Sequence, residues 1–151
     1  MKVMVATDGS DAARRAASEA TRFLHPDAQI ELVAVIPERH DPEDDAGGFE
    51  GPVITDAEAD ADWDRAVATG RKALADTQAA MRADAGAETT LLPSDAAPGA
   101  AIVLMAKDHQ VDLLVLGASE SGFFHRLLGG SVTDHVVHHA PCPLLIVPAP
   151  Q

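Results

Sequence analysis

Short apolar runs recur along the chain, and longer amphipathic stretches separate them. The apolar runs cover residues 2–7, 29–36, 88–94, 111–117 and 143–148, and each predicts a buried strand. The amphipathic stretches cover residues 11–24, 55–86, 97–110 and 131–140, and each predicts a helix. Nearly continuous apolar strands that alternate with helices indicate an α/β fold, an open doubly wound parallel sheet with helices on both faces.

Local signals mark the beginnings of two of these helices. Ser10 is the predicted N-cap of the first helix, whose core stripe is predicted to be Ala13, Ala16, Ala17, Ala20, Phe23 and Leu24. Thr55 and Glu58 have the spacing of a capping box. The helix that they open is predicted to end near Gly86, with one face carrying Trp63, Val67, Gly70, Leu74, Thr77 and Met81. The acidic, glycine-containing segment 38–55 before it predicts a long, mobile, solvated loop.

Of all the strand ends, two are the most marked by glycine and hydroxyl residues. The stretch "ATDGS" follows the first strand, and "GASESG" follows the fourth. Ligands of doubly wound sheets bind outside the carboxyl ends of the strands, where the strand order reverses. The sequence therefore predicts a ligand site between these two segments.

Composition narrows the classes of partner. The net charge is −13 and the pI is about 4.7, so the surface as a whole is unfavourable for nucleic acids or anionic membranes. No apolar run approaches the roughly 20 residues of a membrane span. Cys142 is the only cysteine, which excludes an internal disulfide and fits a cytoplasmic location. A chain of 151 residues suits one domain, residues 1–151.

Three stretches together resemble the universal stress protein family. "VMVATDGS" resembles its first strand and turn, and "HHAPCPLLIVP" resembles its C-terminal signature. The stretch "GASESGFFHRLLGGSV" resembles the motif of the ATP-binding branch, which is Gly, two residues, Gly, nine residues, Gly, then Ser or Thr. Gly117, Gly130 and Ser131 keep the spacing of this motif, whereas Glu120 stands at its second glycine. The resemblance covers nearly the whole chain as a single universal stress protein domain.

The resemblance implies strand order 3-2-1-4-5, an ATP site and a homodimer through the last strand. The residues that it assigns to the nucleotide are Ala6, Thr7, Asp8, Val35, Gly117, Gly130, Ser131, Val132 and Thr133. The Asp8 carboxylate can accept hydrogen bonds from ribose hydroxyls. Gly130 allows the backbone to approach an anion, and the helix that begins at Ser131 favours a phosphate. Glu120 would repel the phosphates unless its side chain points to solvent, salt screens it, or Mg²⁺ bridges it to them.

Several of these residues also fit purely structural roles. Ser131 with Asp134 three residues later is an N-cap pattern, and Asp8 with Gly9 fits a simple turn. Gly117 fits the point at which the fourth strand leaves the sheet. These alternatives stand beside the nucleotide interpretation.

The C-terminal helix and the segment after it raise two further chemical possibilities. His135, His138 and His139 share a helical face, a spacing that could hold a metal, but no acidic ligand is forced near them and we assign no metal site. Cys142 lies between two prolines beside an apolar strand and is interpreted as a buried, unreactive thiol.

Three functions fit this sequence. The favoured one is a nucleotide-binding module of the stress response that acts by binding ATP rather than by fast turnover. The alternatives are a dimeric interaction module of the same fold without nucleotide, and a slow ATP-hydrolysing or adenylate-transferring enzyme. No spacing in the sequence suggests a catalytic Ser-His-Asp arrangement.

Overall fold

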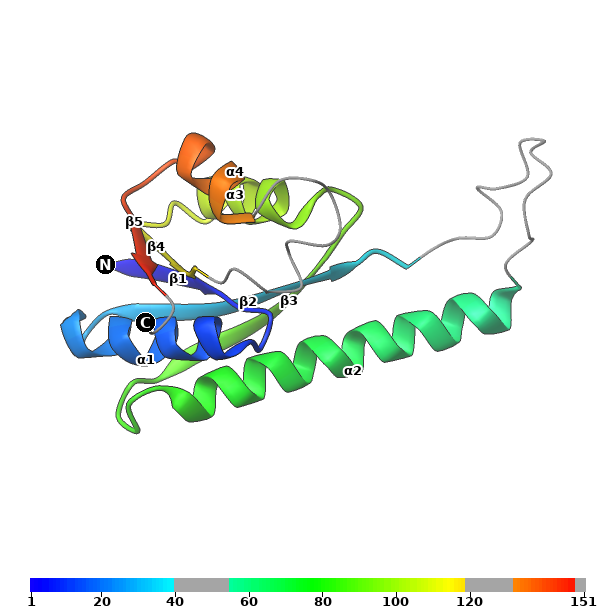
Figure 1. Cartoon of the computed structure of the whole chain (residues 1–151), viewed down its shortest axis with the longest axis horizontal. Helices are drawn as coiled ribbons and strands as arrows, with labels where there is room; N and C mark the ends of the chain where they lie inside the picture. Colours follow the sequence, from blue (N-terminus) through cyan, green and yellow to red (C-terminus); the bar gives the residue numbers. More distant parts are fainter. Residues whose placement is uncertain (40–54, 119–131, 149–151) are drawn as a thin grey trace.

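The computed structural model describes residues 1–39, 55–118 and 132–148. Strands and helices alternate through them: β1 (Lys2–Ala6), α1 (Asp11–Phe23), β2 (Gln29–Pro37), α2 (Asp56–Ala80), β3 (Ala87–Ser94), α3 (Pro98–Asp108), β4 (Leu113–Gly117), α4 (Val132–His139) and β5 (Leu144–Val147). The strands pair in parallel in the order β3-β2-β1-β4-β5 (Figure 1). The predicted sheet and its strand order are confirmed.

Side chains of the central strands divide between two core layers. On β1, Val3 and Val5 pack with α1 and α2, whereas Met4 and Ala6 pack with α3 and α4. The helices accordingly cover the sheet in two pairs, α1 with α2 on one face and α3 with α4 on the other (Figure 1). Because β1 is buried on both faces, its sequence is apolar without alternation.

Small side chains bring α1 close to the sheet. The Ser10 hydroxyl caps this helix by accepting a hydrogen bond from the backbone N–H of Ala13 at 3.2 Å, as predicted. The alanines of the predicted stripe are buried, but the prediction was wrong for Phe23, which is 78% exposed. Phe23 is the last residue of the helix and lies at the edge of the stripe, so contact with the core passes to Leu24.

The capping box at the start of α2 is confirmed. The Thr55 hydroxyl accepts from the Glu58 backbone N–H at 3.3 Å, and the Glu58 carboxylate accepts from the Thr55 backbone N–H at 2.9 Å. This N–H and then the Thr55 hydroxyl lower the pKa of Glu58, because both hydrogen bonds favour its charged form.

The far end of α2 differs from the prediction. The helix ends at Ala80 rather than near Gly86, because the backbone of Met81 turns to an extended conformation that buries its side chain in the core. Of the predicted face, Gly70, Leu74, Thr77 and Met81 are buried, while Trp63 and Val67 are half-buried. At 25 residues α2 is the longest described helix, yet none of the described helices combines the length and apolar character that a membrane span needs.

The predicted acidic loop lies mostly outside the described residues. Residues 40–54 make up most of it. At its beginning, the Glu38 backbone N–H donates to the Ser94 carbonyl at 3.2 Å, which holds the end of β2 beside the end of β3.

Candidate functional site

The turn after β1 lies at the middle of the carboxyl edge of the sheet, because β1 is the central strand. Gly9 has φ +76°, a left-handed conformation that favours glycine. The Asp8 carboxylate accepts a hydrogen bond from the Ser10 backbone N–H at 2.9 Å through Oδ1. The turn that the Asp8–Gly9 pair suggested is therefore present, and it fixes the Asp8 side chain.

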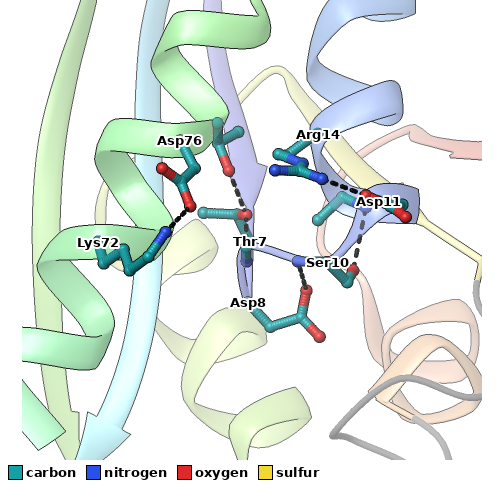
Figure 2. Close-up of polar contacts among 10 residues, drawn as sticks. Thr7, Asp8, Ser10, Asp11, Arg14, Lys72 and Asp76 are labelled. Carbon is teal, nitrogen blue, oxygen red and sulfur yellow. Dashed lines mark hydrogen bonds and ion pairs between the residues drawn. The ribbon is translucent and has the colours of Figure 1, made fainter.

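The Asp8 carboxylate has spare hydrogen-bonding capacity. Among the residues that the structure describes, only its Oδ1 has a hydrogen-bond partner, and the side chain is half-buried. Figure 2 shows Asp8 pointing away from α2, toward the side of the sheet that α3 and α4 cover. A carboxylate in this setting can accept hydrogen bonds from a hydroxyl-bearing ligand.

Thr7 points the opposite way. Its side chain is 3% exposed, and its hydroxyl oxygen lies 2.7 Å from the hydroxyl oxygen of Thr77 on α2. The same oxygen accepts from the Gly9 backbone N–H at 3.0 Å. The Thr7 hydroxyl is thus engaged within the protein. The sequence predicted Thr77 on the buried face of α2 but gave it no role. Because buried hydroxyls are almost always hydrogen-bonded, its burial could have indicated a partner.

Three predicted apolar residues, here called the apolar surface, lie on the α3–α4 side of the sheet, toward which the Asp8 side chain points. Ala6, Val35 and Val132 come from β1, β2 and α4 and pack in the same core layer. Thr133, in the first turn of α4, is half-buried. The structure therefore places these four predicted residues on the α3–α4 side of the sheet.

Gly117 has a packing role that the sequence did not reveal. A Cβ at this position would lie 2.4 Å from the backbone carbon and oxygen of Ala12 and 2.8 Å from the backbone nitrogen of Ala13. Gly117 is also the last residue of β4, where it pairs with Val147, and the N–H of Ala118 donates to the Val147 carbonyl at 2.9 Å. The missing side chain lets the first turn of α1 lie against this end of β4.

The rest of the predicted phosphate loop lies outside the described residues. This applies to Gly130 and Ser131, to Glu120, and to the alternative N-cap role of Ser131. The described part of the site is therefore the turn after β1, the apolar surface beside it and the beginning of α4.

Comparison with known proteins decides the family. The model of the universal stress protein family matches residues 1–148. The chain belongs to this family. Universal stress protein MJ0531 of Methanocaldococcus jannaschii is 27% identical over 155 residues, which span 99% of this chain and 83% of the relative.

Solved structures of universal stress proteins share the fold. A family member from Burkholderia pseudomallei aligns with a TM-score of 0.70 at 24% identity, covering 98% of this chain and 96% of its own. A universal stress protein solved in complex with cAMP aligns with a TM-score of 0.60 at 29% identity, covering 97% of this chain and 96% of its own. An adenine nucleotide is therefore bound by a solved member of the family.

The histidines of α4 in this universal stress protein contact one another and the helix backbone. The rings of His135 and His139 stack with centroids 4.3 Å apart. The Nδ1 atoms of His138 and His139 lie 2.8 Å from the carbonyl oxygens of Asp134 and His135. Within the described ranges, no group of three or more His, Cys, Asp or Glu side chains is arranged to hold a metal.

The single thiol lies between α4 and β5. Burial raises the pKa of Cys142, the Asp112 carboxylate raises it further, and a backbone hydrogen bond with Leu114 opposes them. Because the thiolate is the reactive form, a raised pKa supports the interpretation of Cys142 as unreactive. The prediction that the thiol is buried was wrong, since Cys142 is half-buried.

Proposed function

We propose that this universal stress protein binds an adenine nucleotide, ATP with or without Mg²⁺, at the carboxyl edge of its sheet. The observation that carries the proposal is the half-buried Asp8, which its own turn holds through Oδ1, whereas Oδ2 has no hydrogen-bond partner among the described residues. In this proposal Asp8 accepts hydrogen bonds from the ribose, and the base lies against the apolar surface of Ala6, Val35 and Val132. The cAMP complex of a relative at 29% identity supports the same class of ligand.

The phosphates would extend toward the beginning of α4. Helix N-termini favour anions, because their free N–H groups point outward and the helix dipole is positive there. Thr133 lies in the first turn of this helix. The motif positions Gly117, Gly130 and Ser131 belong to the same proposal, and the last two rest on the sequence motif alone.

Release of bound nucleotide tests the proposal directly. The purified protein is denatured, and the supernatant is analysed by absorbance and mass spectrometry. ATP or a related adenine nucleotide is the expected result, and titration calorimetry then measures the affinity of the emptied protein. Analysis of the same samples for ADP over hours tests the proposal that the protein acts by binding rather than by fast hydrolysis. A protein that releases no nucleotide and binds none at millimolar ATP would rule the proposal out.

Replacing Glu120 with glycine is expected to tighten ATP binding by about tenfold. A carboxylate 4 Å from a phosphate charge costs about 1 kcal/mol in water and about 4 kcal/mol at a surface-like dielectric, and recovery of ~1.4 kcal/mol corresponds to the tenfold gain. Calorimetry at low and high salt without Mg²⁺ measures the effect, and salt should help the wild type more than the variant.

Two further variants accompany this measurement. Glu88→Gln removes the negative charge of an exposed residue on β3 and should leave the affinity unchanged. Gly130→Val should abolish binding, since an added Cβ would block the approach of an anion. Equal affinities of wild type and Glu120→Gly at low salt would mean that the carboxylate does not face the phosphates.

The outer edge of β5 supports a second proposal, a homodimer through this strand. The carbonyls of Pro143 and Val147 accept from the N–H groups of Leu114 and Ala118 at 3.0 and 2.9 Å, so they point toward β4. Because backbone groups of a strand alternate sides, the intervening Leu144 and Ile146 direct theirs away from the sheet. β5 ends the sheet. A second copy of the same edge, related by a two-fold axis, would satisfy these groups. This dimer is also what the interaction-module function requires.

Ile146→Pro is expected to convert this dimer into a monomer. Proline removes the outward N–H of Ile146 but no bond to β4, and edge strands tolerate it at such a position. Sedimentation velocity at micromolar concentration should detect a 15.7 kDa species in place of a dimer. Ile146→Val keeps the N–H and should remain dimeric. A monomeric wild type, or a dimer that Ile146→Pro leaves intact, would exclude pairing through this edge.

A further inference from the structure

A buried pair of hydroxyls joins the candidate site to α2. Thr7 is 3% exposed and Thr77 is fully buried, and their hydroxyl oxygens lie 2.7 Å apart although the residues are 70 positions apart in the chain. The Thr7 oxygen also accepts from the Gly9 backbone N–H at 3.0 Å. Figure 2 shows this connection from α2 through Thr7 into the turn that carries Asp8.

The Thr7 hydroxyl has two described hydrogen-bond contacts, and one of them is with Thr77. A threonine hydroxyl has one hydrogen and two lone pairs. One lone pair of Thr7 receives the Gly9 N–H, and the remaining contact of that buried hydroxyl is with Thr77. Without Thr77, the Thr7 hydroxyl would lose its contact with α2, and the side chain could turn about its Cα–Cβ bond, which would move the oxygen away from the Gly9 N–H.

The same face of α2 also packs closely against Gly9. A Cβ on Gly9 would lie 3.0 Å from the Cα and Cβ atoms of Ala73. Ala73 is one helical turn before Thr77, so both residues lie on the face of α2 that contacts the turn. Helix α2 thus contacts the turn at two residues: Ala73 lies against Gly9, and Thr77 contacts Thr7.

Asp8 lies between these two supported residues. We propose that Thr77 is a positioning residue for Asp8, and that through Thr7 and Gly9 it sets the preference of the site for ligands with ribose hydroxyls. This inference rests on the proposed nucleotide function. It assigns to α2 a role in ligand selectivity although Thr77 itself faces away from the ligand side.

The test compares two ligands, so that a general loss of structure does not imitate the effect. Calorimetry measures the affinities of ATP and of 2′,3′-dideoxy-ATP, which lacks the hydroxyls that Asp8 would bind. Partial misfolding lowers both affinities equally and leaves their ratio unchanged. The wild type is expected to bind ATP at least about tenfold more tightly than 2′,3′-dideoxy-ATP, because a hydrogen bond to a charged group contributes about tenfold to a hundredfold in affinity.

Thr77→Val has nearly the same shape as the wild type and lacks the hydroxyl, and it is expected to reduce the ratio to about threefold or less. Thr77→Ser keeps the hydroxyl and should retain the wild-type ratio. If Thr77→Val does not fold, the double variant Thr7→Val with Thr77→Val removes both hydroxyls, so that neither is left buried without a partner, although the Gly9 N–H then loses its acceptor. It should lose the preference as well.

The outcomes separate this inference from the proposed function. The positioning role is overturned if folded Thr77→Val, or the folded double variant, keeps the wild-type ratio of ATP to 2′,3′-dideoxy-ATP affinity, even if both affinities fall. If the wild type binds neither ligand, the proposed function has failed, and hydrogen exchange at the Gly9 and Ser10 amides decides whether Thr77 orders the turn. Faster exchange in Thr77→Val than in Thr77→Ser by about tenfold supports that ordering; equal exchange overturns it.

Discussion

Gly117→Ala is expected to destabilise the protein by about 3 kcal/mol, the upper end of the usual cost of overpacking. The added Cβ would meet the backbone carbon and oxygen of Ala12 at 2.4 Å, and backbone atoms cannot move aside as a side-chain tip can. The start of α1 or the end of β4 would have to shift. For a chain of this length, the change corresponds to a fall in melting temperature of about 10 °C. Thermal and urea unfolding followed by circular dichroism measure it.

Gly86→Ala is the matched control for this prediction. Gly86 precedes β3, and a Cβ there would meet no heavy atom of any described residue within 4 Å except those of its two neighbours in the chain. This substitution should be neutral or should stabilise the protein by about 0.5 kcal/mol, because alanine restricts the unfolded chain. Equal stabilities of Gly117→Ala and Gly86→Ala would show that α1 does not approach β4 as closely as described.

Asp8→Asn is expected to weaken ATP binding by about tenfold to a hundredfold. The asparagine side-chain oxygen can still accept from the Ser10 N–H, as Asp8 does at 2.9 Å, so the turn is preserved. The second carboxylate oxygen is replaced by an NH₂ group that cannot accept a hydrogen bond from a ribose hydroxyl. Hydrogen bonds to charged groups contribute about 1.5–3 kcal/mol, which sets the expected range. Titration calorimetry with ATP measures the loss.

Asp11→Asn controls for the change in charge. The Asp11 side chain is 92% exposed at the start of α1, and it pairs with Arg14 on the same helix. Its replacement removes one negative charge close to the site without touching the turn, so the ATP affinity should stay within about twofold of the wild type. An unchanged affinity of Asp8→Asn, with the wild type binding ATP, would exclude Asp8 as the ribose-binding group.

Much of the fold was predictable because its causes are local. The run of β1 is apolar throughout since both of its faces are covered, and this burial on both faces is a property of parallel sheets. Ser10 and Thr55 mark helix beginnings because the groups that they cap lie within three residues. Alternation of strands and helices then restricted the topology to a doubly wound sheet, which placed Asp8 at its carboxyl edge.

Contacts between distant segments decided the rest. The burial of Met81 was predicted from the pattern of α2, but the end of the helix at Ala80 was not, because Met81 reaches the core from an extended backbone rather than from the helix. Gly117 must be glycine because α1, about 100 residues earlier in the chain, passes against it. The bond between Thr7 and Thr77 depends on where α2 lies across the sheet.

The sequence by itself determined the elements, their order and the edge where a ligand would bind, since these follow from periodicity, caps and chain connectivity. Only the tertiary structure decided which side chains face the ligand and which hold the turn, because the distance between packed elements sets those roles.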